Sequence, residues 1–454
     1  MLRKDNKVVL RRVTHIKKFF RRWDWLLVVV IAPLLLFPQP GMIWSLLMLP
    51  FILLEQWWAW AEILPVTPLN PAILLMGFMT GVSIYVTPDL LTSLGKVTGV
   101  LLGILVYFTV ARYSKSRQGW KRSLIGITIA GMGVSAIGLV GTTWLPSKIT
   151  GLNTFLTNIP IRLIGLPGAE NGINANELAG ALLWVVPLLF LAGIALLIEP
   201  KWLTDENSDG KIKKTRFTTW LIFLGIAIIT CAGVLVLSQS RDGYIAMIVA
   251  LPLLLFLISK SWSRYLVAGL LILLVMTGVV ITNHAGIEWV ANPLLGTLPA
   301  KGTVFSPDTM FGRVEIWSRA IMAIREVPLT GLGMNVFRRA VYLQEPPFQD
   351  TSFDIAHAHN ELLQAAVDLG LPGLVGFLAL YFTAIGMLVR PIRNRGAIRL
   401  LALGLLGGLM THSIFGLTDA VALGAKPGFL LWWLFGLIAG LYEQTRPVRE
   451  SIQA

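Results

Sequence analysis

The sequence predicts an all-α integral membrane protein with about twelve transmembrane helices. Its 454 residues are 55% hydrophobic and only 14% charged, whereas about 25% of the residues in soluble domains are charged. Apolar runs long enough to cross a bilayer recur along the whole chain. Lysine and arginine are concentrated in short segments between these runs, as in the cytoplasmic loops of membrane proteins. We therefore expect one integral membrane domain instead of several soluble domains.

The net charge of +14 does not indicate a nucleic-acid partner. Most basic residues lie in short loops and tails, so the chain offers no soluble basic face for a phosphate backbone. The expected surroundings are membrane lipids. The single cysteine, Cys231, lies inside an apolar run, so no intrachain disulfide can form.

The order of polar and apolar segments predicts five parts of the chain. Residues 1–24 are basic and lack a small-residue cleavage site after them, which favours a retained cytoplasmic segment. A transmembrane bundle is expected over 25–282, with apolar segments near 25–37, 42–61, 72–86, 90–112, 123–145, 177–199, 217–237, 243–259 and 265–282. A large polar loop covers 283–360. The C-terminal transmembrane helices are expected over 361–443, near 367–389, 400–416 and 428–443, and a basic tail covers 444–454.

The basic clusters predict the orientation of these segments. If the spans alternate from a cytoplasmic N-terminus, every dense cluster of lysine and arginine falls on the same side of the membrane. The large loop then lies on the opposite, extracytoplasmic side, and both termini lie in the cytoplasm. A miscounted span would place the later clusters on the wrong side.

The large loop is expected to fold as a small helical cap. Apolar residues at helical spacing predict a helix over 311–326, and Glu315 is one turn away from Arg319, its expected ion-pair partner. Pro328 ends this helix, and the glycines that follow permit a sharp turn. A second helical stretch carries Arg338. Such amphipathic helices are expected to lie against the membrane surface.

Arginines in this loop are the first candidates for binding. The loop contains Arg313, Arg319, Arg325, Arg338 and Arg339. Because arginine is disfavoured in extracytoplasmic loops, their presence there indicates an anionic ligand. Arg313 begins the predicted helix, and the alternative for it is a place on a solvated helix face.

Arg241 lies in a short connector, 238–242, between two apolar runs. It could be an interfacial arginine whose charge reaches back to water. The alternative is a phosphate ligand, because Ser240, Arg241 and Asp242 precede a helix whose N-terminal amides and dipole favour an anion. Guanidinium also suits phosphate, since its planar fork donates two hydrogen bonds at once.

His357 and His359 are the candidates for proton transfer. A spacing of two residues places both side chains on one face only in extended backbone, and no cysteine or carboxylate cluster lies nearby in the sequence. We therefore expect no metal and no other cofactor. The open alternatives are a structural histidine in a loop and a general base that takes a proton from a hydroxyl. Asn360 is suited to cap the following helix, and Asp419 is a further polar candidate near the end of a late span.

Several of these residues lie in motifs that resemble the O-antigen ligase and polymerase superfamily. The most specific is His359-Asn360 followed, after nine residues, by Gly370-Leu-Pro-Gly373. The others are Gly312-Arg313-xxx-Trp317, Pro328-xx-Gly331-x-Gly333, Ser240-Arg-Asp-Gly243 and Asn174-Ala-Asn176. The resemblance extends from about Asn174 to Leu441, and the N-terminal third is similar only as a bundle of spans.

The resemblance implies an inverting, metal-independent glycosyltransferase of the bacterial cytoplasmic membrane with a GT-C-like helical fold. It implies a glycan on undecaprenyl diphosphate as the donor and a glycan or glycolipid hydroxyl as the acceptor. His359 would then be the catalytic base, while Arg241 and Arg313 would hold the diphosphate leaving group. His357 would assist nearby, and the secondary candidates are Asn360, Arg338 and Asp419.

Two other functions stay open at this point. Ligases of this superfamily often have two threonines after the second glycine of the motif, where this chain has Leu374 and Val375, so a polymerase is an alternative. A transporter or accessory protein is the alternative from another class. It would be expected to show charged or broken-helix sites near the bilayer midplane and repeated halves, which the sequence does not indicate.

Overall fold

The structure, a computed structural model, describes residues 40–48, 64–142, 172–204, 214–258, 310–344 and 355–447, except residue 422, together with a few single positions between these ranges. These residues form helices and connecting loops, with one isolated bridge between Thr142 and Ile173. Among the described residues, seven helices are long and apolar enough to cross a membrane, with Ala175–Ile198 counted as one. The prediction of an all-α, multi-pass membrane protein is thus confirmed for the described part.

The helices agree closely with the apolar segments predicted from the sequence. They are η1 (Pro40–Met48), α4 (Asn70–Val86), α5 (Leu90–Tyr113), α6 (Arg117–Gly141), α8 (Ala175–Leu183), α9 (Val186–Ile198), α10 (Pro200–Leu203), α11 (Lys214–Leu237), α12 (Arg241–Ile258), α15 (Met310–Glu326), α16 (Phe337–Ala340), α17 (Glu361–Arg393), α18 (Gly396–Phe415), η2 (Lys426–Gly428) and α19 (Phe429–Gln444). The expected spans 25–37 and 265–282 lie almost entirely outside the described residues, and 42–61 does so in part. The total of about twelve spans therefore stays a prediction.

Helix starts follow from local side-chain caps. Asp89, Ser116, Asn174 and Asn360 begin α5, α6, α8 and α17, and each accepts a hydrogen bond from a first-turn amide at 2.8–3.1 Å. Such caps satisfy amide groups that have no partner inside the helix. The capping role expected for Asn360 is confirmed.

The outer helices expose apolar stripes, as a lipid environment requires. On α11 the side chains of Ile222, Ile226 and Ile229 are 56%, 50% and 75% exposed. These positions recur about once per helical turn, so they form one face. An apolar face of this kind is unfavourable in water and suits the hydrocarbon region of a bilayer.

Small residues let the central helices approach closely. A Cβ atom at Gly103 of α5 would overlap the indole ring of Trp432 on α19. In the same pair of helices, a Cβ atom at Gly436 would lie 2.6 Å from the Cβ of Val110. Close backbone approach through glycine is a common way for membrane helices to gain packing contacts.

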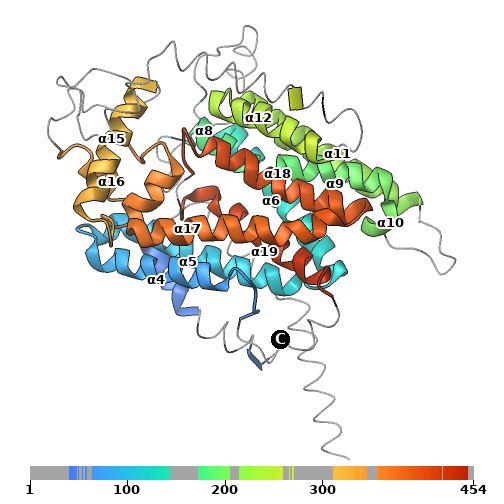
Figure 1. The fold of residues 1–454 in the computed structure, drawn as a ribbon, viewed down its shortest axis with the longest axis horizontal. Coiled ribbons are helices and arrows are strands. Elements are labelled where there is room, and N and C mark those ends of the chain that lie inside the picture. The colour runs from blue at the N-terminus through green and yellow to red at the C-terminus, as the bar shows by residue number, and fades with distance from the viewer. Residues whose placement is uncertain are drawn as a thin grey trace, which may run out of the picture.

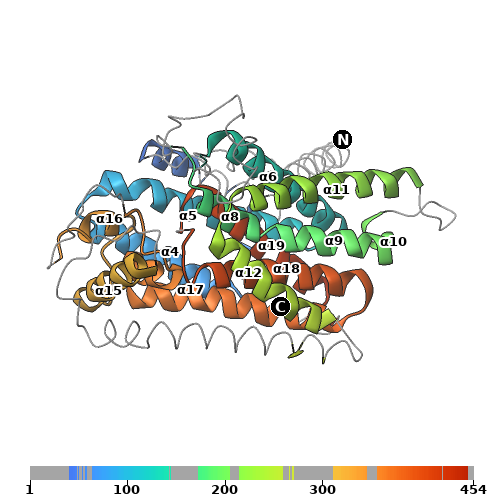
Figure 2. The same ribbon diagram turned by 90° about the horizontal axis from the view of Figure 1, so that it is seen from above.

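The two ends of the bundle differ in their loops. Helices α15 and α16 lie at one end, and α10 lies at the other (Figures 1 and 2). At the α10 end, the basic loops contact one another: Arg117 donates to the carbonyl of Trp202 at 3.1 Å, and the carboxylate of Glu199 accepts from the amide of Ala397 at 2.7 Å. The basic turns therefore gather at one end, and the described helices of the predicted cap, α15 and α16, lie at the other.

Two glycine turns join the cap to α17. Gly370 interrupts α17 with a φ of 69°, and the amide of Leu371 donates to the carbonyl of Pro328 at 2.7 Å. In the opposite direction, the amide of Leu332 donates to the carbonyl of Val367 at 2.8 Å. The turn after α15 thus supplies hydrogen-bond partners to the backbone at the kink in α17. This contact fixes α15 beside the N-terminal half of α17.

Replacing Gly370 with alanine should destabilise the protein. A Cβ atom there would lie 2.6 Å from backbone atoms of Leu329, at a positive φ that favours glycine. We expect G370A to lower the free energy of unfolding by roughly 2 kcal/mol, measured by thermal denaturation in detergent. G386A is the matched control on the same helix, because nothing lies within 4 Å of a Cβ atom at Gly386. Equal melting temperatures for the two variants would contradict this account of the kink.

Candidate active site

His359 occupies a constrained position between the cap and α17. Its φ of 45° lies in the left-handed region, which is uncommon for a residue other than glycine. Its carbonyl accepts a hydrogen bond from the indole of Trp317 at 3.1 Å. Arg313 and Trp317 are four residues apart on α15, so they share one face of that helix. Backbone strain of this kind often occurs at functional sites.

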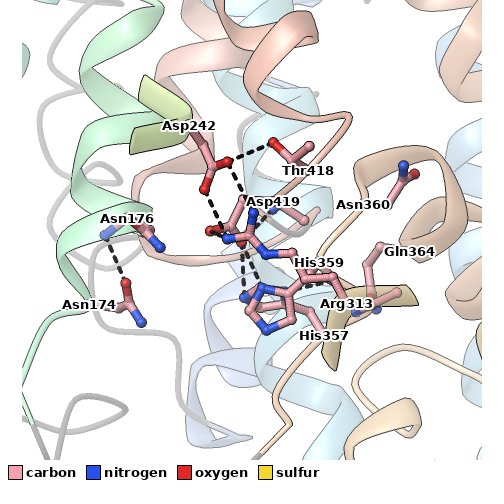
Figure 3. A network of polar contacts seen from close by, with 12 residues as sticks. Asn174, Asn176, Asp242, Arg313, His357, His359, Asn360, Gln364, Thr418 and Asp419 are labelled. Atoms are coloured by element: carbon pink, nitrogen blue, oxygen red, sulfur yellow. Dashed lines mark hydrogen bonds and ion pairs between the residues drawn. The ribbon is translucent and has the colours of Figure 1, made fainter. Parts of the chain in front are cut away.

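The imidazole of His359 is bound to a buried carboxylate. Its Nδ1 lies 3.1 Å from Oδ1 of Asp419, a residue that is 2% exposed (Figure 3). Burial raises the pKa of Asp419, but the hydrogen bond with His359 and the charges of His359, His357 and Arg313 outweigh it, so the pKa is about 2. An ionised carboxylate can only accept, so Nδ1 carries a proton. The other ring nitrogen, Nε2, is then left as an acceptor.

His357 has a different protonation state. The backbone amide of His359 donates to Nδ1 of His357 at 3.2 Å, so the proton of the neutral ring is on Nε2. Burial, followed by repulsion from His359, lowers the pKa of His357 to about 3 despite the attraction of Asp419. His357 is thus a neutral side chain near physiological pH. It is a much weaker base than an ordinary histidine.

Arg313 joins three separate parts of the chain. From the first turn of α15, its guanidinium donates to both oxygens of Asp242 on α12, at 3.0 and 2.8 Å. It also lies 3.6 Å from Oδ2 of Asp419, in the loop after α18. Thr418 adds a hydrogen bond to Asp242 at 2.9 Å (Figure 3). Two carboxylates thus compensate an arginine that is only 7% exposed.

The structure places Arg241 beside this network and not within it. Arg241 is the exposed first residue of α12, whereas its neighbour Asp242 binds Arg313. The hydroxyl of Ser240 accepts from the amide of Gly243 at 3.2 Å and caps the helix. The N-terminus of α12 therefore carries the exposed guanidinium of Arg241 and two hydrogen-bond acceptors, the hydroxyl of Ser240 and the carboxylate of Asp242. The expected binding of a diphosphate by Arg241 and Arg313 stays a prediction.

The remaining candidates lie in different places. Asn360 caps α17, and its side-chain amide donates to the carbonyl of Leu417 at 2.9 Å. Asp419 joins His359 and Arg313 as described above. Arg338 is half-buried on α16 and interacts electrostatically with Lys96 on α5, so it belongs to a neighbouring group of charges.

Four residues of the site were not among the candidates predicted from the sequence. Asp242 and Thr418 complete the ion-pair network, and Gln364 accepts from the amide of Ala358 at 2.7 Å, which fixes the loop beside the two histidines. Lys96 acts on His357 electrostatically. In the sequence, Lys96 could have been noticed as a single cation inside an apolar run, which usually marks a polar function in a membrane protein.

The two histidines and Asp419 also form a group that could hold a metal ion. One ligand atom from each lies within 4.8 Å of the others. Such nitrogen and oxygen ligands suit zinc, with a fourth position left open. Two members of this group, His359 and Asp419, are hydrogen-bonded to each other in the structure. Metal-independent function stays a prediction.

Helical spans, exposed apolar stripes and a buried His–Asp–Arg network at one end define a multi-pass membrane protein with a polar site. Residues 226–378 match the Wzy_C family model, described as O-antigen ligase. This match confirms the family resemblance over that segment, which contains Arg241, Arg313 and His359 but ends before Asp419.

A relative from Haemophilus influenzae, described as an uncharacterized protein, is 25% identical to the chain over 190 residues. The similar region covers 40% of this chain and 47% of the relative. The chain thus spans about half the length of this relative. The description of this relative assigns neither a family nor a substrate.

Breaking the ion pair of Arg313 should be costly. Asp242 and Arg313 are both largely buried, so removing either leaves an uncompensated charge. We expect D242A and R313A each to lower the free energy of unfolding by roughly 3 kcal/mol, and the double variant to lose less than their sum. Thermal denaturation of all three variants measures the coupling. R325A, at an exposed position on the same helix, should have little effect. Additive losses would show that the pair does not act as a unit.

Proposed function

We propose that this protein transfers a glycan from undecaprenyl diphosphate to the hydroxyl of a glycan or glycolipid acceptor. The observation that carries the proposal is the hydrogen bond between His359 and the ionised, buried Asp419. This bond holds the imidazole in the tautomer that a general base needs. The O-antigen ligase match over 226–378 supports the same class of reaction.

In this mechanism His359 removes the proton of the acceptor hydroxyl through Nε2. The oxygen attacks the anomeric carbon of the donor sugar, the bond to the diphosphate breaks, and the configuration inverts. The imidazolium that forms on His359 is stabilised by Asp419, 3.1 Å from its other nitrogen. His357 stays neutral and holds the backbone amide of His359.

The leaving diphosphate requires positive charge. Arg241 offers an exposed guanidinium at the N-terminus of α12, where the helix dipole also favours an anion. Arg313 lies at the same helix end, bound to Asp242. In the proposal these two arginines supply the charge stabilisation that a divalent cation would otherwise give.

The distribution of charge suggests the orientation in a bacterial cytoplasmic membrane. The basic turns gather at the end that carries Arg117 and Ala397, which we assign to the cytoplasm together with both termini. The cap, proposed as residues 283–360, then faces the extracytoplasmic side. We propose that the chain is divided into a transmembrane bundle over 25–282 and C-terminal transmembrane helices over 361–443, with terminal segments 1–24 and 444–454.

A polymerase is the alternative within the same chemistry. Leu374 and Val375 stand where ligases often have two threonines, and a growing glycan would then be the acceptor. A transporter or accessory protein is the alternative of another class, and it would not need a base at His359. Reconstitution with a synthetic polyprenyl-diphosphate glycan and a panel of acceptors separates these functions, because only the enzymes release polyprenyl diphosphate.

Substitution of the two histidines should have unequal effects. H359A removes the base and is expected to lower the turnover number by about 10²–10⁴-fold. H357N keeps an acceptor for the backbone amide of His359, so a loss of about tenfold or less is expected. The release of polyprenyl diphosphate measures both. Normal turnover of a folded H359A variant would refute the proposed base.

Substitution of Arg241 should affect the donor more than the protein. Because this side chain is exposed, R241A is expected to leave the melting temperature unchanged. It should lower kcat/KM for the lipid diphosphate by roughly 10–100-fold, the value of one or two charge-assisted hydrogen bonds. R241K retains the charge but not the planar guanidinium. Its kcat/KM should therefore lie between the values of R241A and the unaltered protein. Full activity of R241A would remove Arg241 from the donor site.

A further inference from the structure

A second histidine–carboxylate pair lies close to the first, inside the bundle. His412 of α18 is fully buried and stacks on the indole of Trp184, with ring centroids 4.0 Å apart. Its Nε2 lies 3.1 Å from Oε1 of Glu361, the first residue of α17. Its Nδ1 lies 2.9 Å from the carbonyl oxygen of Gly180 on α8. The mechanism proposed above uses neither His412 nor Glu361.

The geometry determines how many protons the pair holds. A carbonyl oxygen can only accept, so Nδ1 of His412 must donate to Gly180. The contact between Nε2 and the carboxyl of Glu361 then requires one further proton, on either partner. The pair therefore holds one proton more than a neutral imidazole beside an ionised carboxylate. Its net charge is zero, which suits a buried site of low dielectric.

This pair anchors the segment that carries His359. The amide of Glu361 donates to the carbonyl of Gly416 at 2.7 Å, and the side chain of Asn360 donates to the carbonyl of Leu417 at 2.9 Å. The next contact in the same direction is His359 with Asp419. Three consecutive residues thus bind the loop that follows α18. The His412–Glu361 pair lies at the buried end of this series of contacts, and His359, the proposed base, lies at the other end.

The close fit of this series leaves little freedom. The amide of Gly416 donates to the carbonyl of His412 at 2.7 Å, which ties the loop back to the buried histidine. A Cβ atom at Gly416 would lie 2.6 Å from Oε2 of Glu361. Loss of the contact between His412 and Glu361 would therefore be transmitted along short, direct bonds to the position of His359.

We infer that Glu361 and His412 are positioning residues, which hold a shared proton and thereby fix His359 for catalysis. The inference rests on the proposed role of His359 as the base. A side chain at position 361 that cannot hydrogen-bond Nε2 of His412 would release the N-terminus of α17, and His359 would then lose its fixed position.

The test compares two substitutions of Glu361. In E361Q the side-chain amide can donate to Nε2 of His412, so the contact is kept. We expect the activity of E361Q to be within about threefold of the unaltered protein. E361M has a similar length and no hydrogen bond, and its activity should fall about tenfold or more.

A second readout follows the structure and does not require the glycan reaction. Amide hydrogen exchange of residues 361–369 is compared between variants at the same pH, by mass spectrometry. The unaltered protein and E361Q should protect these amides to a similar extent, and E361M should lose that protection. All other charged side chains are unchanged in both variants, so a difference reports the contact between Glu361 and His412.

The outcomes separate this inference from the proposed function. Full activity or full protection in E361M, or losses in E361Q as large as those in E361M, would overturn the positioning role. Activity in H359A would instead overturn the proposed base, while the exchange comparison would still decide whether the pair anchors α17. Activity and protection that are kept in E361Q and lost in E361M would support the inference.

Discussion

The buried carboxylate of Asp419 is the group on which the site depends. A charge inside a helical membrane protein is unfavourable unless nearby groups compensate it. Here His359 and Arg313, from two other parts of the chain, provide that compensation. Because both must reach the same carboxylate, the loop after α18, the start of α17 and the start of α15 are held together. The same requirement fixes the tautomer of His359.

The cap is part of the helical framework and not an appendage to it. Its turn at Gly331 packs against Gly370 in α17 and exchanges backbone hydrogen bonds with that helix. The bond between Trp317 and the carbonyl of His359 then sets the distance between α15 and the loop before α17. Rigid elements therefore position the side chains, which is what a site with a fixed proton acceptor requires.

Much of this arrangement could be predicted, because it depends on local patterns. The helix over 311–326, its Glu315–Arg319 pair and the cap formed by Asn360 all follow from side chains a few residues apart, and the structure confirms them. The partners of Arg313 could not be found in this way. Asp242 and Asp419 are far from it in the sequence, and an isolated aspartate at a helix end has many ordinary uses.

The sequence by itself determined the class of protein, the places of most helices and the motifs of its family, because apolar length and charge distribution act locally. Only the tertiary structure decided that His359, and not His357, is hydrogen-bonded to the ionised Asp419. It also decided that Asp242, and not Arg241, enters the ion-pair network. The physical reason is that burial and pairing of charge arise where separate segments meet, and no single segment carries that information.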